Sequence, residues 1–238
     1  MTEERPTVDI RHEGSVRFVT LQRAPVNALS MVEYELLAEA FSVAPDGPAR
    51  PRLIVLEARG RVFCAGQDRK EFAALSPTEA GRYLERAGRA VAAAARCPVP
   101  IVSVVTGPAV GAGALLVAVS DCVLMSEDSW LSFPEARMGV LVGRTLLSSF
   151  VPPPMARNLL LTGERIGARR LFEVGSVACV AAADDVAAAR DRRVDDLLSL
   201  SDAALGWLRG IPECAARAQE YEAEVRQSIE ADVWAFAN

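Results

Sequence analysis

The N-terminal part of the chain carries two short β-like stretches followed by an amphipathic one. Residues 7–11 and 15–22 alternate or are rich in β-branched side chains, and Glu13-Gly14 between them fits a tight turn, so we predict a hairpin. In residues 30–42 the apolar positions recur at helical spacing behind a serine, a favoured N-cap. This segment is therefore predicted to be an amphipathic helix.

Short, almost wholly apolar stretches then alternate with helical ones. Residues 52–57 and 100–105 are typical of strands buried on both faces of a parallel sheet, and the alanine-rich segment 77–96 between them predicts a helix. The alternation continues with a buried helix at 111–119 and strands at 121–125 and 130–133. Beyond residue 136 the pattern is helical, with helices expected at 144–150, 154–161, 168–173, 185–199 and 213–235. We therefore predict an α/β fold, with a core at residues 1–185 and a helical C-terminal segment at 186–238.

Composition narrows the class of protein. Of the 238 residues, 51% are hydrophobic and 24% charged, and the net charge of -5 gives no global attraction to nucleic acid or to an anionic membrane. The N-terminus has no apolar signal core and no apolar run is long enough to span a bilayer, so a cytoplasmic location is expected. The five cysteines are widely spaced and fit reduced thiols. His12 is the only histidine and lies near the N-terminus, so we expect no metal site and no Ser-His-Asp mechanism.

The first segment that could carry chemistry is residues 61–72, where a buried strand gives way to Ala65-Gly66 and then to polar residues that could open a helix. A free backbone N–H just past a glycine turn can point into a cleft, as a donor to an oxyanion must. An ordinary strand-to-helix turn is the alternative interpretation.

The second segment, residues 106–115, places small residues at the mouth of the predicted buried helix. The first N–H groups of a helix are unpaired and partly positive, so they stabilise an anion or a developing oxyanion. The glycines of this segment follow the spacing Gly-x-x-x-Gly-x-Gly, which differs from the Gly-x-Gly-x-x-Gly of dinucleotide-binding proteins. We therefore reject a dinucleotide site.

The third segment is Phe133-Pro134-Glu135, directly after a short apolar strand. Apolar neighbours could desolvate Glu135 and raise its pKa into a range useful for proton transfer. A carboxylate at the start of a helix is the simpler alternative.

Together these segments resemble the crotonase superfamily, which is also called the enoyl-CoA hydratase/isomerase superfamily. The resemblance runs from about Val16 to Val180 and rests on four motifs in the same order and spacing, at residues 21–29, 63–70, 107–121 and 133–135. It implies a spiral of strand-strand-helix turns whose helical C-terminal part forms a homotrimer, often a dimer of trimers. It also implies a coenzyme A thioester as substrate, with no separate cofactor.

The resemblance further implies roles for single residues. The thioester carbonyl of the substrate would lie between the backbone N–H groups of Gln67 and Ala112, which would stabilise an enolate, and Glu135 would carry a proton. Contacts with coenzyme A are implied for a further set of residues, the backbone at Ala28, Ala65 and Gly66 near the adenine and the side chains of Arg69 and Lys70 near the phosphates.

One departure from the family pattern bears on the reaction. Family members that add water to a double bond typically use two carboxylates, and the first of these falls on Leu115 in this chain. A leucine cannot hold or deprotonate water, so the sequence favours enoyl-CoA isomerisation through Glu135 alone. The alternatives are a hydratase-like enzyme, a biosynthetic crotonase acting on an acidic thioester with the help of Arg137 or Arg144, and a non-catalytic homologue that supports a partner enzyme.

Overall fold

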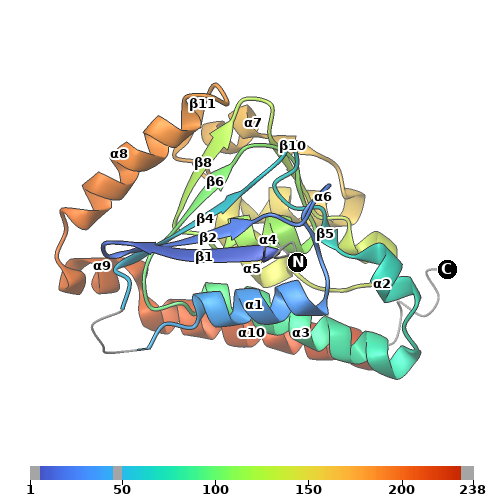
Figure 1. The fold of residues 1–238 in the computed structure, drawn as a ribbon. Coiled ribbons are helices and arrows are strands. Elements are labelled where there is room, and N and C mark those ends of the chain that lie inside the picture. The colour runs from blue at the N-terminus through green and yellow to red at the C-terminus, as the bar shows by residue number, and fades with distance from the viewer. Residues whose placement is uncertain (1–5, 45–49, 232–238) are drawn as a thin grey trace, which may run out of the picture.

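A computed structural model describes residues 6–44 and 50–231 of the chain. A six-stranded sheet lies at its centre. The strand order is β1-β2-β4-β6-β8-β11; β1 and β2 pair as an antiparallel hairpin and all other neighbours are parallel (Figure 1). The strands are β1 (Val8–Glu13), β2 (Val16–Leu21), β4 (Leu53–Ala58), β6 (Ile101–Val105), β8 (Cys122–Ser126) and β11 (Cys179–Ala181). The predicted hairpin and the predicted α/β fold are confirmed.

Both faces of this sheet are covered, which explains why its central strands are almost wholly apolar. Along β4, Leu53 and Val55 face one hydrophobic cluster while Ile54 and Leu56 face another, as the alternation of side chains in a strand requires. The first cluster is completed by helix α8 (Val186–Leu198). The second lies on the opposite side, where α1 (Met31–Phe41), α3 (Pro77–Ala95) and α10 (Ile211–Ala231) form a layer (Figure 1).

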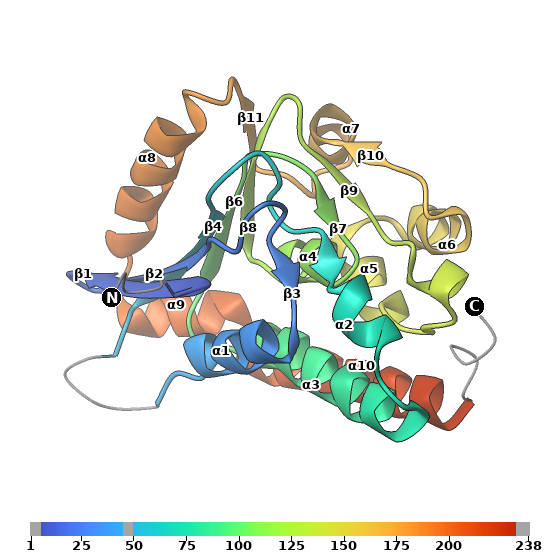
Figure 2. The same cartoon turned by 45° about the vertical axis from the view of Figure 1, so that its right-hand side comes forward.

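Two small sheets lie beside the main one and position the three segments that the sequence predicts to form the active site, residues 61–72, 106–115 and 133–135. Strand β3 (Ala28–Leu29) pairs with β5 (Gly66–Gln67), and β9 (Trp130–Ser132) lies between β7 (Ala109–Val110) and β10 (Ile166–Gly167) (Figure 2). Only β9 was predicted. The others were missed because two residues are too short to show a periodic pattern.

The remaining helices follow the predicted order closely. They are α2 (Arg69–Ala73), α4 (Ala112–Ala118), α5 (Arg144–Phe150), α6 (Pro153–Thr162), α7 (Ala168–Glu173) and α9 (Asp202–Arg209), with the short 3-10 helix η1 at Glu135–Met138. Helix α9 was not predicted, although Ser201 caps its start and Gly210 ends it. The helix predicted at 213–235 begins at Ile211, and residues 232–235 lie outside the described part of the chain.

Helix α9 contacts the core through a buried arginine. The guanidinium of Arg209, in α9, has no exposed side-chain surface, pairs with Asp121 and donates to the carbonyl oxygens of Cys97 and Ala94. A buried guanidinium is stable only when its donors are satisfied in this way. The division of the chain after residue 185 stays a prediction. Within residues 6–44 and 50–231, no helix is both long and apolar enough to cross a membrane.

Candidate active site

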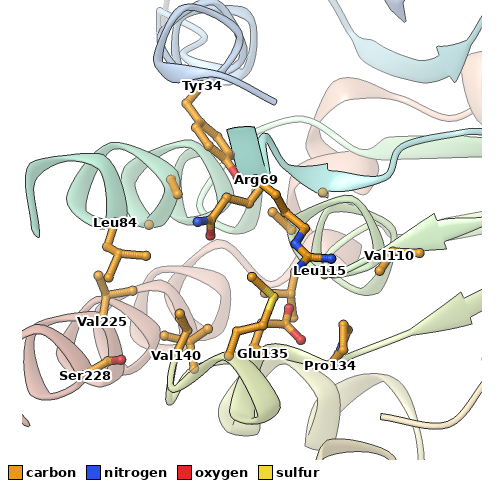
Figure 3. Close-up of a pocket in the computed structure, with 18 of the residues that line it drawn as sticks. Tyr34, Arg69, Leu84, Val110, Leu115, Pro134, Glu135, Val140, Val225 and Ser228 are labelled. Atoms are coloured by element: carbon orange, nitrogen blue, oxygen red, sulfur yellow. The ribbon is translucent and has the colours of Figure 1, made fainter. Parts of the chain in front are cut away.

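A cavity of about 420 Å³ lies between α3 and α10 on one side and α4 and η1 on the other (Figure 3). Its walls are mostly aliphatic and come from elements far apart in the chain. They include Leu84 of α3, Leu115 of α4, Val140 after η1 and Val225 of α10. A cavity of this kind suits an apolar ligand held by a small number of polar groups.

Glu135 provides the central polar group of the cavity. It is the first residue of η1, three residues after the end of β9 at Ser132 and directly after Pro134, and Figure 3 shows it among the residues that line the cavity. Both of its carboxylate oxygens are buried and without a hydrogen-bond partner among the described residues. Burial raises the pKa of Glu135 from 4.5 to about 7. The side chain can therefore accept and release a proton near neutral pH.

The mouth of helix α4 opens directly beside this carboxylate. A methyl group added to Gly111, the residue before the helix, would lie 3.6 Å from Oε1 of Glu135, and the φ of +55° at this position favours glycine. The N–H of Ala112 belongs to the first residue of α4, so it has no intrahelical acceptor. Ala112 and Glu135 thus line the same cavity, with Gly111, which has no side chain, at the mouth of the helix.

The second predicted donor, Gln67, is brought to the same place by close contact between β5 and the start of α4. A methyl group added to Gly66 would lie 3.5 Å from the nitrogen of Ala112 and only 2.6 Å from the carbonyl oxygen of Val110. Gly66 has a φ of +80°, which an L side chain rarely adopts. Only glycine allows the two segments to approach this closely.

Cys64 holds these two segments together. Its N–H donates to the carbonyl of Pro108 at 3.2 Å, and its carbonyl accepts from the N–H of Val110 at 2.9 Å. A methyl group added to Gly113 would lie 2.5 Å from its Cβ, so α4 packs directly on this cysteine. Burial raises the pKa of the thiol to about 12, which suits a packing role and not a nucleophile.

Sequence reasoning missed two polar residues that fix the loops around the site. The side-chain amide of Asn27 donates to the carbonyl oxygens of Arg59 and Val62 at 2.9 and 2.8 Å. The hydroxyl of Tyr83 donates to the carbonyl of Leu29 at 2.5 Å and accepts from the N–H of Asp68 at 3.1 Å, which joins β3 to the start of α2. The positive φ of Asn27 is the kind of position that favours asparagine, but the sequence does not show which carbonyls it meets.

Most of the predicted site residues meet at the cavity. Those that line it are Glu135, Gln67, Ala112, Ala65, Gly66 and Arg69. Ala28 and Lys70 are outside this lining: Ala28 pairs with Gly66 between β3 and β5, and Lys70 is exposed on α2.

The two arginines considered for an acidic substrate group lie in different places. Arg137 lines the cavity. Arg144 is 78% exposed, lies outside the lining, and pairs with Glu224 at 3.6 Å. Leu115, on which the family resemblance places the first carboxylate of hydratases, lines the cavity and is 1% exposed.

Comparison with known proteins identifies the family. The sequence model of the enoyl-CoA hydratase/isomerase family matches residues 11–233. The chain belongs to this family. This match confirms the family that the four sequence motifs indicate. As a member of the enoyl-CoA hydratase/isomerase family, the protein is an enzyme that acts on acyl-CoA compounds.

Relatives of this family member carry both hydratase and hydrolase names. It is 35% identical over 196 residues to a Mycobacterium tuberculosis protein named (7aS)-7a-methyl-1,5-dioxo-2,3,5,6,7,7a-hexahydro-1H-indene-carboxyl-CoA hydrolase, covering 81% of this chain and 78% of that protein. It is 33% identical over 189 residues to a probable enoyl-CoA hydratase of Mycobacterium leprae, covering 76% of this chain and 74% of that protein.

Solved structures confirm the predicted crotonase fold of this family member. An enoyl-CoA hydratase of Mycobacterium avium subsp. paratuberculosis superposes with a TM-score of 0.83 at 24% identity, covering 98% of this chain and 94% of that one. An enoyl-CoA hydratase of Mycobacterium smegmatis gives a TM-score of 0.78 at 28% identity, covering 92% and 90%.

Proposed function

We propose that the protein isomerises enoyl-CoA thioesters, moving a double bond from the 3,4 to the 2,3 position with Glu135 as the only proton carrier. The observation that supports this reaction most strongly is the number of carboxylates that line the cavity. Among the described residues that line it, Glu135 is the only acid, and the lining includes the buried Leu115, on which the family resemblance places the first carboxylate of hydratases. One acid that ionises near pH 7 suffices for a proton shift, whereas the usual hydration chemistry of the family uses two.

The proposed reaction begins with ionised Glu135, which removes a proton from C2 of a 3-enoyl thioester. The electron pair of the broken C–H bond moves into the conjugated system, and negative charge develops on the thioester oxygen. The N–H groups of Gln67 and Ala112 stabilise this dienolate, and the loss of one such donor typically costs about 3 to 4 kcal/mol in the transition state. Glu135 then returns the proton to C4, leaving the double bond between C2 and C3.

The apolar walls contribute to this chemistry. Leu84, Leu115 and Val225 exclude water from the site, and a low dielectric strengthens both the interaction with the two N–H dipoles and the basicity of the buried carboxylate. The carrier portion of the substrate would lie toward Arg69 and the exposed Lys70, whose charges suit phosphate groups.

The proposal is tested by following the absorbance of the conjugated thioester after 3-hexenoyl-CoA is added to purified protein. We expect conversion by the native protein and its loss in Glu135→Gln, which keeps the shape of the side chain and removes the base. Glu173→Gln is the matched control: Glu173 is exposed and pairs with Arg170, so this substitution should leave the activity unchanged. Lack of conversion by the native protein, or full activity in Glu135→Gln, would overturn the proposal.

Hydrolysis of a ring-bearing CoA thioester is a second candidate. It is supported by the 35% identity with the mycobacterial protein that is named a hydrolase of a dioxo-hexahydroindene carboxyl-CoA. Hydrolysis of a thioester consumes one water and yields the free carboxylic acid and coenzyme A thiol, whereas isomerisation consumes no water. Incubation of the named thioester with this protein should therefore release free coenzyme A, detected with a thiol reagent, if the protein is such a hydrolase, and leave the thioester unchanged if it is not.

The homotrimer implied by the family resemblance is also part of the proposal. Trp207 and Leu208 of α9 are 81% and 63% exposed, and large apolar side chains at the surface suit a contact between copies. The mass of the protein in solution tests this, and a monomer at micromolar concentration would contradict it.

A further inference from the structure

The cavity contains a buried amide that the proposed reaction does not use. Four buried side-chain polar atoms lack a hydrogen-bond partner among the described residues: Nε of Arg17, Nε2 of Gln67 and the two carboxylate oxygens of Glu135. Three of these four belong to residues that line the cavity. The proposed proton transfer explains why the carboxylate oxygens of Glu135 have no partner. It does not explain the unpaired side-chain amide of Gln67, because the reaction uses only the backbone N–H of this residue.

An unpaired buried amide needs an explanation. Leaving such a donor without an acceptor is costly, so native proteins rarely do it away from functional sites. Nε2 of Gln67 has no acceptor among the described residues, and Gln67 itself lines the cavity. The surrounding wall is largely aliphatic, with Leu84, Val140 and Val225 among its residues. A ligand bound in the cavity is the natural source of an acceptor.

The position of this amide relative to the thioester is set by the backbone. Gln67 is held in β5 by its pairing with Leu29, and the next residue, Asp68, donates its N–H to the carbonyl of Leu29 at 2.9 Å. The backbone N–H of Gln67 is the proposed donor to the thioester oxygen. Its side-chain amide is only two methylene groups from Cα, so it reaches a short distance along the acyl group.

We propose that the side-chain amide of Gln67 selects acyl-CoA substrates that carry a second acceptor oxygen, a ketone or hydroxyl, a few carbons from the thioester. The inference rests on the proposed function, because it takes the thioester to be bound at the N–H groups of Gln67 and Ala112. The rest of the acyl group remains apolar and contacts the aliphatic walls. Gln67 is in this account a specificity-determining residue through its side chain and an enolate-stabilising residue through its backbone.

The test measures binding and does not depend on turnover. Dissociation constants are determined by calorimetry for hexanoyl-CoA and for 3-oxo-, 4-oxo- and 5-oxohexanoyl-CoA, which differ from it only by one ketone oxygen. We expect at least one oxo thioester to bind the native protein about tenfold more tightly than hexanoyl-CoA, the size of one hydrogen bond made to an otherwise unpaired group.

Gln67→Met carries the decisive comparison, because methionine has a similar length and no N–H donor. In this variant the preference for the oxo thioester, taken as the ratio of the two dissociation constants measured with the same protein, should fall to about onefold, whatever the variant's affinity for hexanoyl-CoA. Gln67→Leu serves the same purpose if Gln67→Met does not fold.

Two results would overturn the inference: equal affinity of the native protein for all four thioesters, or a preference for an oxo thioester that persists without the amide. The second result would indicate that a bound water or another donor serves the ketone. Either result leaves isomerisation of 3-hexenoyl-CoA untouched, so failure of the inference and failure of the proposed function are distinguishable.

Discussion

The burial of Glu135 couples its chemistry to the stability of the fold. The pKa of Glu135 is about 7 in the folded protein against 4.5 ordinarily, so the folded state holds the proton more tightly than the unfolded chain does. The stability that this provides is complete below about pH 4.5 and is lost as the pH rises through about 7. Relative to Glu135→Gln, which cannot ionise, the native protein should lose about 3 kcal/mol of unfolding free energy between about pH 5 and about pH 8. Denaturant unfolding of both proteins across this pH range measures the difference. A constant difference would show that Glu135 ionises at its ordinary pKa.

The sequence predicts Glu135 well and the side chain of Gln67 poorly, for physical reasons. Glu135 follows an apolar strand and a proline, so its desolvation can be inferred from its neighbours in the chain. The unpaired amide of Gln67 depends on what surrounds it in space, and Leu84 and Val225 come from helices far away in sequence. Only the assembled cavity shows that the amide has no protein acceptor.

At the scale of elements, the contact between β5 and α4 sets the distance between the two proposed N–H donors. Gly66→Ala would place a methyl group 2.6 Å from the carbonyl oxygen of Val110, so the two segments must move apart. Because the loss of a single oxyanion donor lowers kcat by about 10² to 10³, we expect an activity loss of at least about a hundredfold. Steady-state kinetics with 3-hexenoyl-CoA measures it.

Gly60→Ala is the matched control for backbone strain. Gly60 also has a positive φ, +96°, but a methyl group added there meets nothing within 4 Å. This variant should lose about 1 to 2 kcal/mol of stability and keep its activity. Equal activity losses in the two variants would mean that strain, and not the approach of β5 to α4, is responsible.

The long elements were predicted because their patterns are strong and local, whereas the short ones were not. The strands β4 and β6 are largely apolar, and α3 begins with a serine cap and a proline, which are signals carried by the segment itself. The two-residue strands β3 and β5 exist only because each pairs with the other across the chain. Their pairing positions Gln67, so part of the site escapes an analysis of the sequence alone.

At the scale of the whole molecule, α10 reaches back from the C-terminal part to support the wall of the cavity. Glu224 accepts hydrogen bonds from the N–H groups of Gly143, Arg144 and Thr145 at 2.9 to 3.1 Å and from the Thr145 hydroxyl at 2.7 Å. These residues follow Val140 and Val142, which line the cavity. Glu224→Gln should lower the unfolding free energy by about 1 to 3 kcal/mol, because charge-assisted bonds at a buried helix start are weakened.

Glu222→Gln is the control on the same helix. Glu222 pairs with Arg96 at 2.5 Å at the surface, and exposed ion pairs contribute about 0 to 1 kcal/mol. Thermal or denaturant unfolding compares the two variants. If both cost the same, the link from α10 to the start of α5 has no special part in stability.

The central claim is that Glu135 moves a proton without adding water. The most direct test is the mass of the product that the purified protein forms from 3-hexenoyl-CoA, measured beside Glu135→Gln. We predict 2-hexenoyl-CoA of unchanged mass from the native protein and no product from the variant. A main product heavier by one water would contradict the claim, because it would show that hydration proceeds with a leucine at position 115.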